Sequence, residues 1–296
     1  MKIKDALFWG ERKLNSKNIE NPRLEAEVLL LDVLKIPKEN LFQKLEETLS
    51  RPLFKKYQRL IEKRALGFPF FYILGKREFW KHYFFVAPKI LIPRPETEIL
   101  LEKALEDLKN LESFLKKENK KINIIDVGTG TGCIIISLFK ELEKFPFWNN
   151  LIFYGTDISK KALRIAQKNA KNLKTTAINF KKGNLLKPIN DSKNYYFILA
   201  NLPYIKEKNY KNLPDEIKKF EPKMALWAGN DGLLYYRRLF KQIQKRKLKV
   251  LEILIEIDPT LKKSIFLLTK KYFPNSRIEF FNDFSGKTRV AKIVFI

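Results

Sequence analysis

The sequence predicts an α/β fold, with a small helical domain, a β-hairpin linker and a doubly wound, mostly parallel sheet of seven strands that ends in an antiparallel hairpin. Three observations predict it. The first ninety or so residues have helical periodicity, the chain from residue 122 alternates short apolar runs with amphipathic segments, and the last two apolar runs are too close together for a helix between them. With 296 residues and 45% hydrophobic content, the chain can bury the cores of one large and one small domain.

The helical domain is expected to span residues 1–77. Asn21 followed by Pro22 is typical of a helix cap and first turn, and apolar residues follow at helical spacing. Ser50 and Pro52 begin a second such segment, which ends at Gly67. These start and stop signals predict a small helical module.

The next segment, residues 78–94, is rich in aromatic and β-branched residues and predicts a hairpin or two strands that join the domains. It closes at Pro93-Arg94-Pro95, and Pro95 then begins a helix with Glu96 and Glu98 in its first turn. The large domain is therefore expected to span residues 95–296.

Short apolar strands and amphipathic helices follow one another through this large domain. Strands are predicted near Ile122 to Val127, Leu151 to Asp157, Thr176 to Lys182, Tyr195 to Ala200, Leu251 to Asp258, Arg277 to Phe281 and Arg289 to Ile296. Helices are predicted near Cys133 to Leu142, Ser159 to Asn172, Gly232 to Lys245 and Thr260 to Tyr272. Only a seven-residue turn, Asn282 to Thr288, separates the last two strands, so they should pair antiparallel.

The composition excludes several classes of protein. The sequence has no run of 18 uncharged apolar residues, which a membrane-spanning helix would need. The first residues lead into no apolar signal segment, so we expect a cytoplasmic protein. A single cysteine, Cys133, excludes an internal disulfide, and with a single histidine, His82, we expect no metal site. Both are interpreted as structural residues. We also expect a monomer.

The formal net charge of +26 could indicate a nucleic-acid-binding surface. However, the basic residues are 46 lysines and 13 arginines, whereas arginine is the residue that phosphates and bases prefer. A general drift of composition toward lysine is the favoured interpretation. Direct nucleic-acid binding stays the alternative.

A glycine-rich turn, Gly128-Thr129-Gly130-Thr131-Gly132, follows the first strand of the large domain and enters a helix. Glycines there allow a sharp turn and let a ligand approach main-chain N–H groups. A dinucleotide fingerprint would need a glycine at position 133, where the chain has Cys133, so the spacing favours S-adenosylmethionine, which has no pyrophosphate. A tight turn without a ligand is the alternative.

Polar residues after the next two strands extend this predicted cofactor site. Asp157 ends the second strand, where its carboxylate could accept hydrogen bonds from ribose hydroxyls, although a helix cap would also explain it. Asn184 and Leu185 follow the third strand and could contact an adenine ring, with loop filling as the alternative.

The turn Asn201-Leu202-Pro203-Tyr204 follows the fourth strand and suits a flat nitrogen nucleophile. The lone pair of an amide or aromatic amine is conjugated, so acceptors on its two N–H bonds, from the Asn201 side chain and the Leu202 carbonyl, would hold it for in-line methyl transfer. Pro203 stiffens the turn, and Tyr204 offers a flat surface. We therefore predict these four residues to be catalytic.

At this point the sequence resembles the release factor glutamine methyltransferases of the HemK (PrmC) type. The resemblance rests on Phe71-Tyr72-Ile73-Leu74-Gly75, Glu78-Phe79-Trp80, Leu91 to Glu98, Phe220-Glu221-Pro222, Ala225-Leu226 and Gly229 to Leu233, together with the two turns, and covers nearly the whole chain. It implies a Rossmann-like, S-adenosylmethionine-dependent methyltransferase domain behind a substrate-recognition domain. It also implies methylation of N5 of the glutamine in the Gly-Gly-Gln loop of peptide chain release factors, with Asn201 contacting both cofactor and glutamine.

Two departures and three alternatives accompany this resemblance. Leu202 replaces the first proline of the family's signature, which still leaves a main-chain carbonyl, and Asp258 stands where a glycine is usual. The alternatives are N5-glutamine methylation of a ribosomal protein, N6-adenine methylation of DNA or RNA, and an inactive RNA-binding scaffold. No additional target-recognition module for a flipped base is evident, and the intact turns argue against an inactive scaffold.

Overall fold

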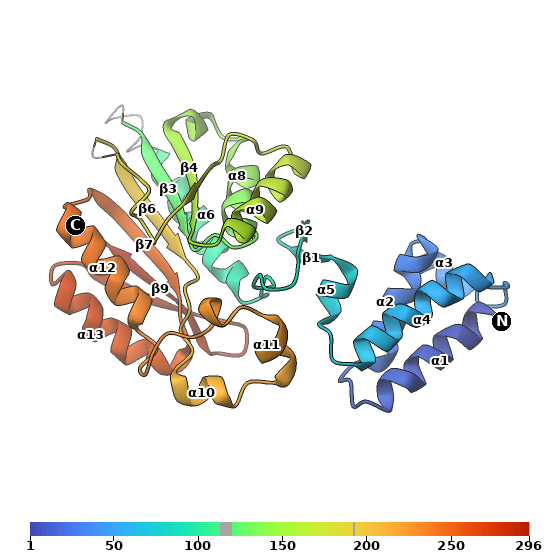
Figure 1. Ribbon diagram of the computed structural model, residues 1–296. Coiled ribbons are helices and arrows are strands. Elements are labelled where there is room, and N and C mark those ends of the chain that lie inside the picture. The colour runs from blue at the N-terminus through green and yellow to red at the C-terminus, as the bar shows by residue number, and fades with distance from the viewer. Residues whose placement is uncertain (113–119, 192, 296) are drawn as a thin grey trace. The chain divides into compact units, whose positions relative to one another are not determined.

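The computed structural model of the chain describes residues 1–112, 120–191 and 193–295 (Figure 1). They form two compact units, one of residues 1–76 with 214–220 and the other of residues 77–213 with 221 onward. The domain limits expected from the sequence, 1–77, 78–94 and 95–296, stay predictions. Each unit is described by itself.

The first unit is helical. Its helices are α1 (Ile3–Asn15), α2 (Pro22–Leu34), α3 (Lys38–Gln43), α4 (Arg51–Ala65), α5 (Phe70–Leu74) and α11 (Asp215–Phe220). The two helices predicted from their proline starts are α2 and α4, and the chain leaves α4 through Gly67 at a φ of +81°. Leu30 of α2 packs in one buried cluster with Tyr57 and Ile61 of α4. The two helices therefore share one buried core.

The predicted hairpin forms from β1 (Lys76–Phe79) and β2 (His82–Phe85). Its turn residues Trp80 and Lys81 have φ angles of 45° and 66°, as in the two-residue turns that match the twist of a hairpin. The helix that follows, α6 (Thr97–Asn110), begins two residues after Pro95, because Glu96 is its N-cap.

A sheet of seven strands forms the centre of the second unit. The strands are β3 (Ile122–Val127), β4 (Leu151–Asp157), β5 (Asn179–Lys182), β6 (Tyr195–Ala200), β7 (Val250–Glu256), β8 (Arg277–Asn282) and β9 (Thr288–Val294). Their order is β5-β4-β3-β6-β7-β9-β8, with β9 antiparallel to both β7 and β8 and all other neighbours parallel. The predicted mostly parallel sheet with an antiparallel carboxyl-terminal hairpin is confirmed. Ile296, the predicted last residue of the final strand, lies outside the described residues.

Helices cover both faces of this sheet. They include α8 (Cys133–Leu142), α9 (Lys160–Asn172), α12 (Leu234–Arg246) and α13 (Lys262–Tyr272), with the short helices η1 (Pro146–Asn150), α10 (Glu207–Lys211), η2 (Lys223–Ala225) and η3 (Pro259–Leu261) in the connections. Figure 1 shows α8 and α9 on one face and α12 and α13 on the other. Along β3, Ile124 packs in the core of the first face and Ile125 in that of the second, as alternation along a strand requires.

The strand order places a topological switch between β3 and β6. From β3 the chain proceeds outward through β4 to β5 and then returns to add β6 on the other side of β3. Ligands of open α/β sheets bind beside the carboxyl ends of the strands at such a point. The last residues of the two strands, Val127 and Ala200, are register partners, so the turns that follow them are neighbours.

Candidate active site

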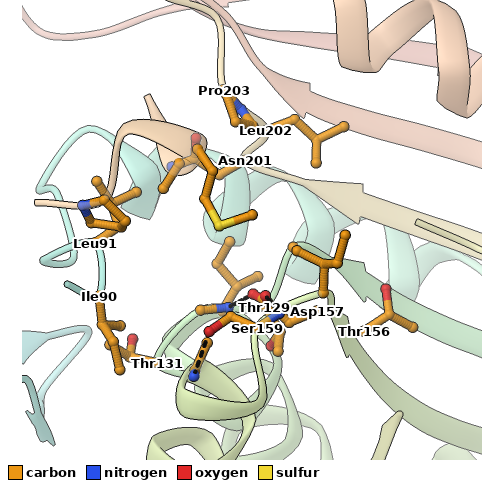
Figure 2. A pocket seen from close by; sticks show the side chains of 18 of the residues that line it. Ile90, Leu91, Thr129, Thr131, Thr156, Asp157, Ser159, Asn201, Leu202 and Pro203 are labelled. Carbon is orange, nitrogen blue, oxygen red and sulfur yellow. Dashed lines mark hydrogen bonds between the residues drawn. The ribbon is translucent and has the colours of Figure 1, made fainter. Parts of the chain in front are cut away.

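A cavity opens at this switch point, within the second unit. Four segments that follow parallel strands line it, at residues 128–131, 156–159, 183–185 and 201–203. Figure 2 shows Asn201, Leu202 and Pro203 on one side of the cavity and Thr129, Asp157 and Ser159 across from them, with Ile90 and Leu91 on a third side. Of the twelve positions predicted from the sequence, ten line the cavity, and Gly132 and Tyr204 do not.

The glycine-rich turn has the left-handed backbone that glycine allows. Gly128, Gly130 and Gly132 have φ angles of 80°, 56° and 81°. The N–H of Gly128 donates to the carbonyl of Thr156 at 2.8 Å, which ties the turn to the end of β4. A Cβ on Gly132 would lie 2.8 Å from Ile136 Cδ1, so this glycine permits close packing of the turn on its helix and does not face the cavity.

Asp157 holds the glycine turn and the start of α9 together. Its Oδ2 accepts from the N–H of Gly130 at 3.0 Å, and its Oδ1 accepts from the N–H of Ser159 at 2.8 Å. Burial, partly opposed by these bonds, raises the pKa of the carboxyl group above its ordinary value. The Ser159 hydroxyl in turn accepts from Ala162 N at 3.2 Å as the helix cap. Each Asp157 oxygen retains a second lone pair with which it could accept from a ligand hydroxyl.

The turn after β5 is held from outside by one glutamine of α12. Gln242 Oε1 accepts from the N–H of Leu186 at 3.0 Å, and its Nε2 donates to the carbonyl of Asn184 at 3.3 Å. Between them Leu185 has a φ of 55°, a strained value for a leucine, and its side chain lines the cavity. Both amide atoms of Gln242 thus stabilise a turn that presents Asn184 and Leu185 to the cavity.

The side-chain amide of Asn201 is oriented by a buried chain of hydrogen bonds. Its Nδ2 donates to Thr97 Oγ1 at 3.0 Å, and the Thr97 hydroxyl donates to Glu256 Oε2 at 2.6 Å. Thr97 begins α6 and Glu256 ends β7, so elements far apart in the chain meet here. Because Nδ2 faces Thr97, Oδ1 is the end of the amide that remains as an acceptor toward the cavity.

Leu202 lies between the two turns. Its side chain is only 4% exposed, and its Cδ2 would lie 3.2 Å from a Cβ built on Gly128. Its carbonyl oxygen is 3.5 Å from the hydroxyl of Tyr236, which donates at 2.6 Å to the carbonyl of Glu256 instead. The Leu202 carbonyl therefore has capacity for a stronger donor.

Tyr204 takes a different place from its neighbours. Its hydroxyl donates to Glu256 Oε1 at 3.3 Å, and its ring belongs to the core between the sheet and α12. A Cβ on Gly232 would lie 2.6 Å from the Tyr204 carbonyl oxygen, so glycine allows the start of α12 to approach this turn. In this structure Tyr204 supports the carboxylate of Glu256, and its predicted contact with a flat substrate stays a prediction.

Several titratable groups around the site are buried. Burial raises the pKa of Glu256 to about 7, against the lowering effect of its bonds from Thr97 and Tyr204. Burial likewise raises the pKa of Asp126, just before the glycine turn, to about 7. The Cys133 thiol lines the cavity, but burial raises its pKa to about 12, so it is neutral and a poor nucleophile.

An ion pair joins two segments at the rim of the cavity. Arg94 Nη2 donates to both carboxylate oxygens of Glu221, at 2.6 and 2.8 Å, and the Glu221 side chain is almost fully buried. Arg94 and Pro222 both line the cavity. The pair therefore holds the Arg94 segment and the start of the Pro222 segment together.

The residues of the cavity suit S-adenosylmethionine. Asp157 offers carboxylate oxygens for hydroxyl groups, Ile158 is 52% exposed at the cavity, and Leu185 adds a further apolar wall for an aromatic ring. Thr156 Oγ1 is buried in the cavity wall without a hydrogen-bond partner among the described residues. By contrast, no cluster of three or more histidine, cysteine, aspartate or glutamate residues suited to a metal ion occurs within residues 1–112, 120–191 and 193–295.

Sequence reasoning missed Thr97, Glu256 and Gln242. Thr97 lies in the segment Leu91 to Glu98 that carries the resemblance, and Glu256 lies two residues before Asp258. No local pattern connects either residue to Asn201. A polar residue inside an apolar strand, as in Leu254-Ile255-Glu256-Ile257, is the signal that could have identified Glu256. Gln242 lies on an ordinary amphipathic helix and has no such signal.

Asp258, the second departure from the family pattern, caps the η3 turn. Its Oδ1 accepts from the N–H of Thr260 at 2.8 Å and from the hydroxyl of the same residue at 2.5 Å. An aspartate in this place therefore has a local structural explanation.

No helix of the described residues is both long enough and apolar enough to cross a membrane.

Comparison with known proteins agrees with this architecture. The PrmC N-terminal domain matches residues 5–75, and a methyltransferase domain family matches residues 118–230. Among solved structures, the catalytic domain of hMettl16 in complex with a MAT2A hairpin has a TM-score of 0.55 at 16% identity, covering 80% of this chain and 82% of that one. The N-terminal domain of human METTL16 in complex with SAH has a TM-score of 0.50 at 16% identity, covering 90% of each chain. At such identities the likeness shows the fold alone.

Curated relatives show the family. The release factor glutamine methyltransferase of Dictyoglomus turgidum is 35% identical over 99% of this chain and 98% of its own length. Those of Bacillus cereus and Bacillus subtilis are each 32% identical, covering 98% and 97% of this chain and 98% and 96% of their own lengths. The chain therefore belongs to the release factor glutamine methyltransferase family and is an S-adenosylmethionine-dependent methyltransferase.

Proposed function

We propose that this enzyme methylates the side-chain nitrogen, N5, of the glutamine in the Gly-Gly-Gln loop of peptide chain release factors. The observation that carries the proposal is the shared cavity, which the glycine turn at Gly128 and the acceptor turn at Asn201 line from opposite sides. Methyl transfer by in-line displacement needs donor and nucleophile in one such space. The relatives, which are release factor glutamine methyltransferases, support the choice of substrate.

The residues predicted to bind the cofactor divide the work. The backbone of Gly128 to Thr131 would receive the portion of the cofactor that approaches the main chain, Asp157 would accept from its hydroxyl groups, and Asn184 and Leu185 would contact its ring. When bound, S-adenosylmethionine supplies a methyl group on a positively charged sulfur, which becomes a neutral thioether as the C–S bond breaks.

The acceptor turn orients the glutamine. Asn201 Oδ1 and the Leu202 carbonyl would each accept one N–H of the substrate amide, which directs the nitrogen lone pair toward the methyl group. As the new N–C bond forms, positive charge develops on this nitrogen, and two fixed acceptors stabilise it. No general base is needed, because the methylated nitrogen is acidic and loses one N–H proton to solvent. Pro203 would stiffen the turn, and Tyr204 would support it from the core through its hydrogen bond to Glu256.

The substrate also suggests roles for the rest of the chain. The helical unit, which the PrmC N-terminal domain matches, would recognise the release factor outside the glutamine loop. A substrate that acts in translation would place the enzyme in the cytoplasm, as a monomer that meets its substrate transiently. The charge of +26 needs no nucleic-acid partner in this scheme.

The test incubates the purified chain with methyl-labelled S-adenosylmethionine and, separately, a release factor, its variant with the loop glutamine changed to alanine, ribosomal protein, and DNA or RNA. Label should enter the wild-type release factor alone. Label in the alanine variant, or a preference for ribosomal protein or nucleic acid, would contradict the substrate assignment. The variant Asn201→Ala should lose most turnover while it still binds the cofactor, and a near-normal rate would contradict the acceptor roles.

A further inference from the structure

The hydrogen-bond chain from Glu256 through Thr97 to Asn201 has a fixed direction. An ionised carboxylate has no proton to donate, so the hydroxyl of Thr97 must donate to Glu256 Oε2, at 2.6 Å. The Thr97 oxygen is then left with lone pairs only, and it can meet the Asn201 amide only at its NH2 end, at 3.0 Å. The charge on Glu256 therefore determines which end of Asn201 faces the cavity.

We propose that Glu256, acting through Thr97, is the positioning group that keeps the Asn201 oxygen turned toward the substrate amide and so holds the acceptor turn in its reactive arrangement. This inference rests on the proposed function of Asn201. Neither Glu256 nor Tyr204 lines the cavity, and Glu256 is only 2% exposed, so the carboxylate acts at one remove from the reacting atoms.

Protonation of Glu256 would release this constraint. A protonated carboxyl group can donate to Thr97 Oγ1, which frees the Thr97 hydroxyl to donate in turn to an oxygen. An Asn201 amide rotated by 180°, with Oδ1 toward Thr97, would then find an equally good hydrogen-bond partner. In that orientation the NH2 group faces the cavity and opposes the N–H bonds of a substrate amide.

The surroundings of Glu256 place this change near neutral pH. Burial raises the pKa of the carboxyl group to about 7. Several groups from other elements act on it: Thr97 and Tyr204 by hydrogen bonds, Glu96 by like charge and Arg289 by opposite charge, and the buried Tyr236 and Cys133 are further neighbours. Arg289 is shared with Asp283, at 2.8 Å, and with Glu96, at 3.8 Å, so it neutralises Glu256 only in part.

A kinetic test compares three variants of the full chain. Thr97→Val keeps the shape of the side chain and removes the hydroxyl, and it should lower kcat about 10- to 100-fold with the KM for S-adenosylmethionine within about twofold of wild type. Thr97→Ser restores the hydroxyl and should recover kcat to within about threefold of wild type. A purely structural role would not separate serine from valine in this way.

The pH profile tests the carboxylate itself. In the wild type, kcat should rise with pH through a midpoint near 7, because Glu256 ionises there. In Glu256→Gln this rise should disappear and kcat should be low throughout, since a glutamine side chain can satisfy Thr97 in either direction. A rise in Glu256→Gln at the same midpoint as in the wild type would overturn the proposal.

An NMR measurement reads the same relay without any substrate. The side-chain NH2 resonances of Asn201, assigned by their loss in Asn201→Asp, should shift with pH in the wild type, and Thr97→Val should abolish this titration. Wild-type kcat in Thr97→Val, or Asn201 resonances that do not respond to pH in the wild type, would overturn the proposal. If the enzyme fails to methylate release factors while these resonances titrate as expected, the substrate assignment is wrong and the relay stands.

Discussion

Leu202 Cδ2 would lie 3.2 Å from a Cβ built on Gly128, so the leucine that replaces the first proline of the family's signature packs directly on the glycine turn. The two turns of the candidate active site are therefore in contact as well as opposite one another. A leucine in place of a proline fills this contact with a flexible side chain, and the proposed acceptor role of its main-chain carbonyl does not depend on that side chain.

Gly128→Ala tests this contact. The variant should bind S-adenosylmethionine at least about tenfold more weakly and lose stability, because it adds strain at a φ of 80° and pushes on Leu202. The strain alone costs about 1–2 kcal/mol. Calorimetric titration and thermal unfolding measure both effects.

Gly286→Ala is the matched control, since Gly286 has the same φ of 80° and nothing within 4 Å of an added Cβ. It should lose similar stability and keep cofactor affinity. Equal affinity losses in the two variants would show that the contact with Leu202 is unimportant.

Leu202→Ala and Asn201→Ala should give opposite patterns. Leu202 is buried in the core beneath α12, so its truncation should lower the free energy of unfolding by about 2–4 kcal/mol with kcat within a few-fold of wild type. Asn201 is partly exposed at the cavity, so its truncation should cost little stability and most of kcat. Denaturant unfolding measures the stability of each variant, and turnover is measured at denaturant concentrations well below the unfolding midpoint. A large loss of kcat in Leu202→Ala would show that its side chain takes part in positioning the substrate.

Arg94→Met should destabilise the second unit and raise the KM for the protein substrate. The substitution removes both hydrogen bonds that Arg94 Nη2 donates to the buried carboxylate of Glu221, at a cost of about 1–3 kcal/mol. Lys103→Met breaks an exposed pair with Glu106 and should cost less than about 1 kcal/mol. A double-mutant cycle with Glu221→Gln measures the coupling, and strictly additive effects would argue against a functional ion pair.

Glu252 predicts a pH dependence of stability remote from the cavity. Burial within the sheet, and the nearby carboxylate of Asp107, raise the pKa of Glu252 well above its ordinary value, against the pull of Lys292. The folded chain therefore holds this proton more tightly than the unfolded chain, and stability falls as pH rises above about 4.5, where the unfolded chain ionises.

Glu252→Gln should therefore gain stability relative to wild type as pH is raised from 5 to 8, measured by denaturant unfolding at each pH. Glu106→Gln is the control, because hydrogen bonding to Lys103 lowers the pKa of that exposed residue, so it is ionised in both states above pH 5 and its difference from wild type should stay flat. An unchanged difference between Glu252→Gln and wild type over this range would show that Glu252 is ionised in the folded chain.

Local patterns predicted most of the strands and long helices. The strand at Tyr195–Ala200 and the helix at Cys133–Leu142 have the predicted limits, because apolar runs and the glycine turn determine where they begin and end. The predicted strand from Thr176 begins only at Asn179, since Thr175 and Ile178 belong to the turn that leaves α9. The short helices α3, α10 and α11 were not predicted, because five or six residues carry too little periodicity.

The candidate site divides in the same way. Gly128 and Asn201 are recognisable because each lies in a short motif directly after a strand. Thr97 contacts Asn201, 104 positions away, and Glu256, 159 positions away. No local pattern encodes contacts between residues so far apart. The orientation of Tyr204 toward Glu256 likewise depends on β7, which lies after the motif in the chain.

Because Thr97, Asn201 and Glu256 are far apart in the sequence, they are synthesised at different times. Residues 128–132 and 201–204 are synthesised before Glu256, and β7 must pair with β6 before the hydrogen bond between Glu256 and Thr97 can form. The group proposed to orient Asn201 is therefore synthesised after both motifs. Glu256 lies within the last fifth of the polypeptide, so a nascent chain carries the motifs before it has the orienting hydrogen bonds.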